Sequence, residues 1–295
     1  MNPRDPVTSM KPFIAVGNAS LVEPMLAKVD MLKFGGDLLH LACSGGKKEI
    51  VELLISKGAD IMNPPERVHG EDSYRRAPFV LQAVASGDAA TLALVMSHGG
   101  SLTDSGFIGL SKKRKNLVIS NVIGCAAWHG SSDLLDDLVG RLGKDNIDIE
   151  AMEQPDKHAK APGPFKKEMA RYTPLLLAVA KSDDNLECAK SLLKFGANVH
   201  VTDEYGNTLL HVAALNGNNK ILDYIAKNLK INMFERNSDG ETALNICATL
   251  KNAEGVKMLE QYQEEYDKSK DRADDLLAEL GKEEEQDEEA KARRR

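Results

Sequence analysis

The stretch "GNTLLHVAALNG" at residues 206–217 places one histidine, His211, among leucines and alanines with almost no other polar side chain nearby. A near copy, "GGDLLHLACSGG" at 35–46, places His40 in the same surroundings. In isolation such a histidine would suggest a catalytic base or a metal ligand. Because the pattern occurs twice in one chain, it predicts a structural repeat.

Other segments follow the same order: a short apolar helix, a glycine or small polar residue, and a second helix with apolar residues at helical spacing. Good copies begin near residues 37, 78, 121, 172, 207 and 239, and a degenerate one begins near residue 11. Threonine or aspartate can cap the first helix, and glycine can end it in the left-handed conformation. One such helix pair cannot bury both of its faces, but stacked copies can.

The segments "DEYGNTLLHVAALNGN", "YTPLLLAVA", "LLKFGANV" and "LISKGADI" resemble the ankyrin repeat, whose unit is about 33 residues long. The resemblance covers residues 11–259. It implies an all-α ankyrin-repeat solenoid of six to seven repeats at 11–252, after an N-terminal arm at 1–10. It also implies that His40 and His211 are structural. The fifth copy departs from the pattern, with Leu176 in place of the histidine and an extra residue near Asp183.

The composition agrees with a helical repeat protein. Aromatic residues make up only 5% of the chain, which is low for a β-sandwich or barrel. The four cysteines lie far apart in apolar segments without zinc-ligand spacing, so we expect reduced core residues: Cys43, Cys125, Cys188 and Cys247. No signal-peptide pattern or membrane-length apolar run occurs, so we expect a cytoplasmic protein, with the nucleus as the alternative.

Three junctions between repeats are much longer than the family's short turn: residues 62–77, 103–120 and 150–171. The resemblance places them as inserted fingers beside the concave face. Long irregular loops in a compact domain are either functional or disordered. We expect the three to be functional.

Two features make this face the predicted partner-binding surface. The second finger carries the run "KKRK", which suits an acidic protein partner, a nuclear localisation signal or simply a solvated loop: Lys112, Lys113, Arg114 and Lys115. Trp128 and His129 fill variable positions that the resemblance places on the exposed concave side, where a tryptophan would be a binding hot spot. The alternative is that Trp128 packs beneath a long finger. Glu204 and Tyr205, at variable turn positions, are weaker candidates.

The last outer helix is predicted to continue through residues 253–281 as a possible coiled coil. Its apolar seam has heptad spacing, with a weak centre at Ser269. The seam residues are Leu259, Tyr262, Tyr266, Ala273, Leu276 and Leu280. The helix would bind a partner helix or a second copy, or cap the stack. Residues 282–295 are charged and expected to be disordered. Of the net charge of −7, −6 falls within residues 254–295.

No catalytic motif occurs, and we expect no cofactor, no metal, no membrane contact and no nucleic-acid partner. The sequence therefore predicts a non-enzymatic adaptor or structural linker, with one protein partner on the concave ankyrin face and a second contact through the C-terminal helix. The alternative is a nucleus-directed regulatory factor that uses residues 112–115 as its localisation signal. A third hypothesis is that the acidic tail covers the basic finger.

Overall fold

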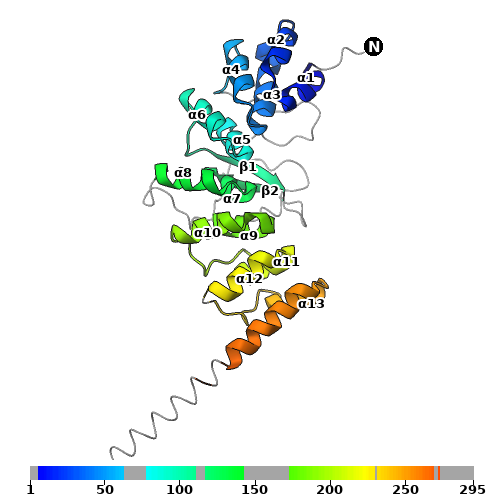
Figure 1. Ribbon diagram of the computed structural model, residues 1–295, viewed down its shortest axis with the longest axis vertical. Coiled ribbons are helices and arrows are strands. Elements are labelled where there is room, and N and C mark those ends of the chain that lie inside the picture. The colour runs from blue at the N-terminus through cyan, green and yellow to red at the C-terminus, as the bar shows by residue number, and fades with distance from the viewer. Residues whose placement is uncertain are drawn as a thin grey trace, which may run out of the picture.

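The computed structural model describes residues 6–62, 78–110, 117–142, 173–229, 231–268 and 272. Within these residues the helices form seven pairs stacked along the long axis of the molecule (Figure 1). The first helices of the pairs are α1 (Pro6–Val16), α3 (Met31–Ser44), α5 (Phe79–Ser86), α7 (Val122–His129), α9 (Pro174–Lys181), α11 (Leu209–Asn216) and α13 (Ala243–Thr249). The second helices are α2 (Ala19–Leu26), α4 (Lys48–Ser56), α6 (Ala89–Ser97), α8 (Ser132–Leu142), α10 (Leu186–Lys194), α12 (Asn219–Asn228) and the C-terminal helix at 253–268.

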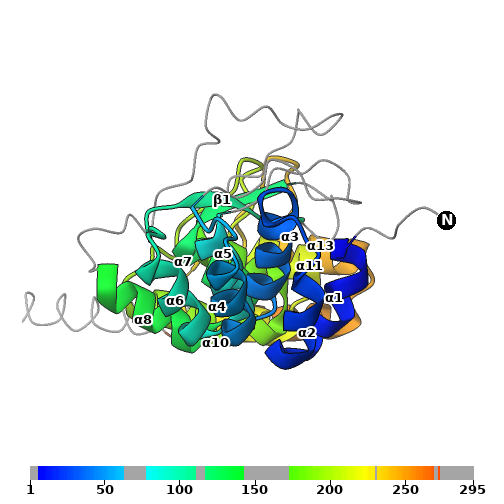
Figure 2. The ribbon, with the colours of Figure 1, turned by 90° about the horizontal axis from the view of Figure 1, so that it is seen from above.

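The helices form two layers. The first helices pack in one continuous row from α1 to α13, and the second helices lie on one side of this row (Figure 2). Small residues let neighbouring first helices approach closely, since Ala42, Ala126 and Ala213 are fully buried. The predicted all-α solenoid is confirmed. The degenerate first copy is a real helix pair, α1 and α2.

Left-handed turns separate the two helices of a pair. In five of the seven repeats a glycine with φ between 61° and 85° follows the first helix: Gly17, Gly46, Gly87, Gly130 and Gly217. In the last repeat Lys251 occupies this position with φ 58°, and it is the only non-glycine residue with positive φ in the described part of the chain.

Polar side chains join consecutive repeats. Asn185 Nδ2 donates to the carbonyl oxygens of Ala127 (2.6 Å) and Trp128 (3.0 Å), at the end of the preceding first helix. Asn218 Nδ2 donates to the Val179 carbonyl (2.7 Å) in the same way one repeat later. These bonds satisfy carbonyl groups that the end of a helix leaves without an intrahelical partner.

His211 is 1% exposed and joins two repeats. Its Nδ1 accepts hydrogen bonds from the Thr208 backbone N–H (3.2 Å) and hydroxyl (2.8 Å). Its Nε2 lies 2.9 Å from the Glu241 carbonyl oxygen in the next repeat, which assigns the proton to Nε2. This is the arrangement expected of a structural histidine. The other histidine of the pattern, His40, is partly buried.

One inserted junction is regular, not irregular as expected. At the junction predicted over 103–120, strands β1 (Ser105–Leu110) and β2 (Leu117–Asn121) form an antiparallel hairpin in which Leu110 pairs with Leu117. The hairpin lies on the side of the first helices opposite the second helices (Figure 2). Gly124 occupies the position of the repeat histidine and packs against buried Ser120 of β2. Only glycine fits there, because a Cβ at residue 124 would lie 2.7 Å from Ser120 Cβ.

Helix α1 begins at Pro6 and buries Val7 and Met10, so the predicted arm at 1–10 is wrong from residue 6 onward. The extra residue of the fifth copy forms a 3₁₀ turn, η3 (Asp183–Asn185). The other two fingers, predicted at 62–77 and 150–171, lie outside the described residues except for Met62.

All four cysteines are buried free thiols, as expected. Burial raises the pKa of the Cys43 thiol to about 12. The pKa of Cys188 is raised to about 11 by burial, with Asp136, Glu187 and Asp133 adding to the effect. Burial also raises the pKa of Cys125 and Cys247. The thiols are therefore protonated core residues.

Candidate protein-binding site

Trp128 is not an exposed anchor. It is 2% exposed, which corrects the prediction that it lies open on the concave face. Helix α7 packs against α9, and Lys181 at the end of α9 places its Nζ 4.5 Å from the centre of the Trp128 ring. The indole therefore lies within the stack, because the next repeat offers it apolar contact and a cation–π partner. Its neighbour His129 is exposed.

The other predicted contact residues have different surroundings. Lys112, Lys113, Arg114 and Lys115 lie outside the described residues, in the chain that connects β1 to β2. Glu204 is exposed and Tyr205 is half-buried. The Tyr205 carbonyl accepts a hydrogen bond from the Ser238 N–H (2.9 Å), so this turn is fixed to the turn of the following repeat.

The predicted seam of the C-terminal helix begins packed on the stack. Leu259 is buried, and the Tyr262 hydroxyl donates to Asp223 Oδ1 of α12 at 2.6 Å. This hydrogen bond, with burial, raises the pKa of Tyr262 to about 12. Leu259 and the hydroxyl of Tyr262 therefore hold the helix against its own stack. Ala273, Leu276 and Leu280 lie outside the described residues.

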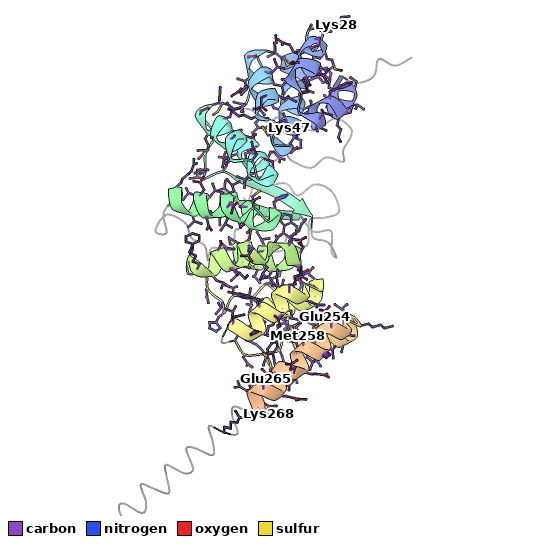
Figure 3. The ribbon with its side chains drawn as sticks, viewed as in Figure 1. Lys28, Lys47, Glu254, Met258, Glu265 and Lys268 are labelled. Carbon is purple, nitrogen blue, oxygen red and sulfur yellow. The ribbon has the colours of Figure 1, made fainter. Side chains whose placement is uncertain are left out.

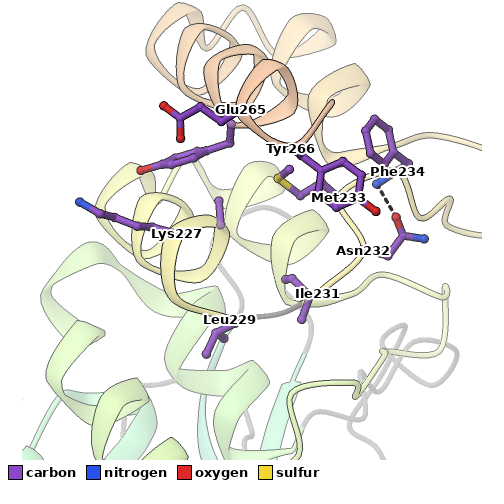
Figure 4. Close-up of a pocket in the computed structure, with 10 residues that line it drawn as sticks. Lys227, Leu229, Ile231, Asn232, Met233, Phe234, Glu265 and Tyr266 are labelled. Carbon is purple, nitrogen blue, oxygen red and sulfur yellow. Dashed lines mark hydrogen bonds between the residues drawn. The ribbon is translucent and has the colours of Figure 1, made fainter. Parts of the chain in front are cut away.

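Further along this helix an open groove begins. It has a volume of about 680 Å³ and lies between α12, the chain that follows it and the C-terminal helix (Figure 4). Its lining is mainly apolar: Ala226, Leu229, Ile231, Met233, Phe234, Tyr262 and Tyr266, together with Lys227, Asn232 and Glu265. We call this the C-terminal groove.

Two aromatic residues stand at one end of the C-terminal groove. Tyr266 is 52% exposed and Phe234 is 39% exposed, although their ring centres lie 5.7 Å apart. The close-up shows them side by side with Met233, whereas Lys227 and Glu265 lie toward the opposite end (Figure 4). Partly exposed aromatic side chains in a concave apolar site are typical of protein-binding anchors.

The sequence analysis did not identify Phe234, Met233, Leu229 or Ile231. A signal was present: the sixth copy ends in "AKNLKINMF", where other copies have "KGAD" or "FGAN". Asn228, the last residue of α12, occupies the position of the left-handed glycine in those copies (Gly58 and Gly196), and Leu229 after it has an extended backbone (φ −105°, ψ 132°). The altered turn places apolar side chains beneath the projecting helix.

Metal-binding clusters and membrane-spanning helices are absent from the described residues. Within them, no group of three or more histidine, cysteine, aspartate or glutamate side chains is arranged to hold a metal ion. No helix in the described part is long and apolar enough to cross a membrane.

Family comparison agrees with this architecture. The chain matches the family described as "Ankyrin repeats (3 copies)" over residues 123–234 and 175–270, and the family "Ankyrin repeat" over 35–65. These matches cover more than half of the 295 residues, so the chain belongs to the ankyrin-repeat family. Ankyrin repeats are protein–protein interaction modules.

Individual relatives match only parts of the chain. It is 38% identical over 89 residues to the nuclear factor NF-kappa-B p105 subunit of Gallus gallus, covering 30% of this chain and 9% of the relative. It is 42% identical over 57 residues to the human protein phosphatase 1 regulatory subunit 27, covering 19% of this chain and 36% of the relative. The chain thus spans only a small part of these curated relatives.

The fold matches a solved structure over most of its length. The human ASB11 ankyrin repeat domain superimposes with a TM-score of 0.54 at 20% identity, covering 88% of this chain and 98% of that domain. This likeness concerns the fold alone.

Proposed function

We propose that the protein is a non-enzymatic adaptor that holds two protein partners at separate places on one rigid stack. The first place is the side of the first helices that carries the hairpin β1–β2. The second is the C-terminal groove, which is formed by second helices. A rigid scaffold loses little conformational entropy on binding, which favours affinity.

The observation that carries this proposal is the anchored hairpin. Its strands pack on α5 and α7, and Ser120 fits against Gly124. The six residues that join Leu110 to Leu117 contain four consecutive basic residues. A basic tip on a fixed hairpin would speed and orient the capture of an acidic protein surface.

The second candidate is a nucleus-directed regulatory factor that uses the same four basic residues as a localisation signal. Two relatives are named as a nuclear factor subunit and a phosphatase regulatory subunit, which suits a regulatory role. We propose a cytoplasmic location for the adaptor, with nuclear entry as the feature that distinguishes this second function.

One variant tests both functions. In it Lys112, Lys113, Arg114 and Lys115 are all changed to glutamate. The matched control reverses four exposed lysines elsewhere: Lys28, Lys194, Lys220 and Lys257. Both chains and the wild type are used for affinity capture from native lysate and are imaged as fluorescent fusions.

The adaptor proposal expects a protein partner that the wild type and the control capture but the hairpin variant does not. Loss of nuclear signal without loss of any partner would favour the second function. If the hairpin variant and the control behave alike in both assays, the hairpin tip has neither role.

A further inference from the structure

We propose that the C-terminal groove binds an amphipathic helix of a partner protein, with an apolar stripe flanked by lysine or arginine. This deepens the second contact of the proposed adaptor function and rests on it. Three features of the groove point to such a helix.

The first feature is its shape. The groove has one helical wall from α12 and another from the C-terminal helix, and its floor comes from residues 229 and 231–234. Two neighbouring helices with an apolar furrow between them can receive a third helix, whose residues at spacings of three and four enter the furrow. The volume of about 680 Å³ gives room for several side chains of such a stripe.

The second feature is its apolar lining and position. Phe234, Tyr266 and Met233 offer two aromatic rings and a flexible thioether, which adapt to bulky apolar side chains. The groove lies between the last two repeats, and the described part of the chain has no further repeat beyond them (Figure 1).

The third feature is charge. Between residues 260 and 268 the C-terminal helix carries four acidic residues and one basic residue: Glu260, Glu264, Glu265, Asp267 and Lys268. All five are exposed, and Lys268 forms an ion pair with Glu264 at 3.6 Å. Glu265 and Lys268 project from the far part of this helix (Figure 3). Lys227 of α12 also lines the groove, so the four carboxylates against Lys227 and Lys268 leave a net charge of −2. This negative charge attracts a helix with basic flanks.

The same charge argues against a second copy as the occupant. A second copy would bring the same acidic stretch to the groove, and like charges across an interface are unfavourable. We therefore infer a heterologous partner, and self-association becomes an outcome that the test can detect.

The test begins with a phage-displayed library of helical peptides of about 20 residues, long enough to span a groove between helices. Its apolar stripe is fixed, and its flanking positions vary among lysine, arginine, aspartate and glutamate. The library is selected on the full-length protein. We expect the selected peptides to have basic flanks, and their affinity is then measured by fluorescence anisotropy.

The selected peptide is measured against matched variants. The double variant Phe234→Ala, Tyr266→Ala should weaken binding by about tenfold or more, as expected for removing two anchors. The control Phe13→Ala removes an equally exposed aromatic residue, 38% exposed on α1, and should leave affinity unchanged. The variant Glu265→Lys, Asp267→Lys keeps the apolar lining and should also weaken binding, by less at high salt.

Several results would overturn the proposal. In one, the selection enriches peptides with acidic flanks or enriches no helical peptide. In another, the selected peptide binds the double variant as tightly as the wild type. Sedimentation equilibrium could also show that the wild type forms a dimer and the double variant does not. In that case the occupant of the groove would be a second copy and not a partner helix. Reversing the hairpin charges must leave peptide affinity unchanged, so failure of the hairpin contact and failure of the groove can be distinguished.

Discussion

At the scale of one residue, Lys251 has a left-handed backbone conformation (φ 58°) that favours glycine. Glycine takes this left-handed turn in five other repeats, whereas a side chain with a Cβ is strained there. The turn survives because the Asn252 N–H donates to the Cys247 carbonyl (2.9 Å) and Asn252 pairs with Asn219 in the preceding repeat.

We expect Lys251→Gly to raise the free energy of unfolding. Relief of left-handed strain should add about 1–2 kcal/mol to the free energy of unfolding. The greater conformational freedom of glycine in the unfolded chain should subtract roughly 0.4–1 kcal/mol from it. Urea denaturation measures the difference. The control Gly217→Ala, at φ 70°, should lower stability. A Lys251→Gly protein less stable than the wild type would show that the lysine side chain has a stabilising contact.

The buried thiols predict a pH dependence. The pKa of Cys43 is raised from its ordinary value of 9.0 to about 12 in the folded protein, so folding opposes ionisation of this group. Its contribution to stability is fully present below pH 9 and is lost as the pH rises toward 12.

We therefore expect the four thiols to react with a disulfide reagent at pH 8 only slowly in the native protein. All four should react at once in denaturant, since a thiolate is the reacting species. Fast reaction of one native thiol would contradict its described burial. Mass spectrometry of the labelled peptides would then identify that cysteine.

At the scale of elements, the hairpin depends on one glycine. Gly124 replaces the repeat histidine and makes room for Ser120, and the Gly124 N–H donates to Asn121 Oδ1 at 2.9 Å. Strand β2 therefore runs directly into α7 without a separate turn. The sequence predicted an irregular loop here because glycines and charged residues interrupt the alternating pattern typical of strands. The pairing of β2 with β1 also depends on residues that are not adjacent in the chain.

We expect Gly124→Ala to destabilise the protein by about 1–3 kcal/mol, as overpacking of a buried contact does. Thermal unfolding measures the loss. Ser120→Gly should restore part of it in the double variant, because it removes the overlapping side chain. Equal destabilisation in the single and double variants would show that Ser120 does not cause the effect.

At the scale of the whole molecule, the helices of each described repeat pack mainly against the neighbouring repeats, so we expect stability to be local along the stack. A cavity made at one end should therefore loosen that end alone. In the proposed adaptor, the two contacts could therefore be perturbed separately.

Hydrogen exchange tests this independence with two matched cavities. We expect Leu259→Ala to reduce protection in α11, α12, α13 and the C-terminal helix, and Leu38→Ala to reduce it in α1 to α5, each side chain being fully or almost fully buried. Each substitution should cost about 2–5 kcal/mol. Uniform loss of protection over the whole chain in both variants would show that the stack unfolds as one unit.

The sequence by itself determined the repeat, the helix pairs, the glycine turns and the buried cysteines, because each follows from the residues of one repeat and recurs along the chain. Tertiary structure decided the rest. Trp128 is buried because Lys181 and α9 come from the next repeat, and the groove exists because Phe234 and Tyr266 meet across two repeats. Such contacts depend on the spatial relation of residues that are distant in the chain, which the pattern of a single repeat does not contain.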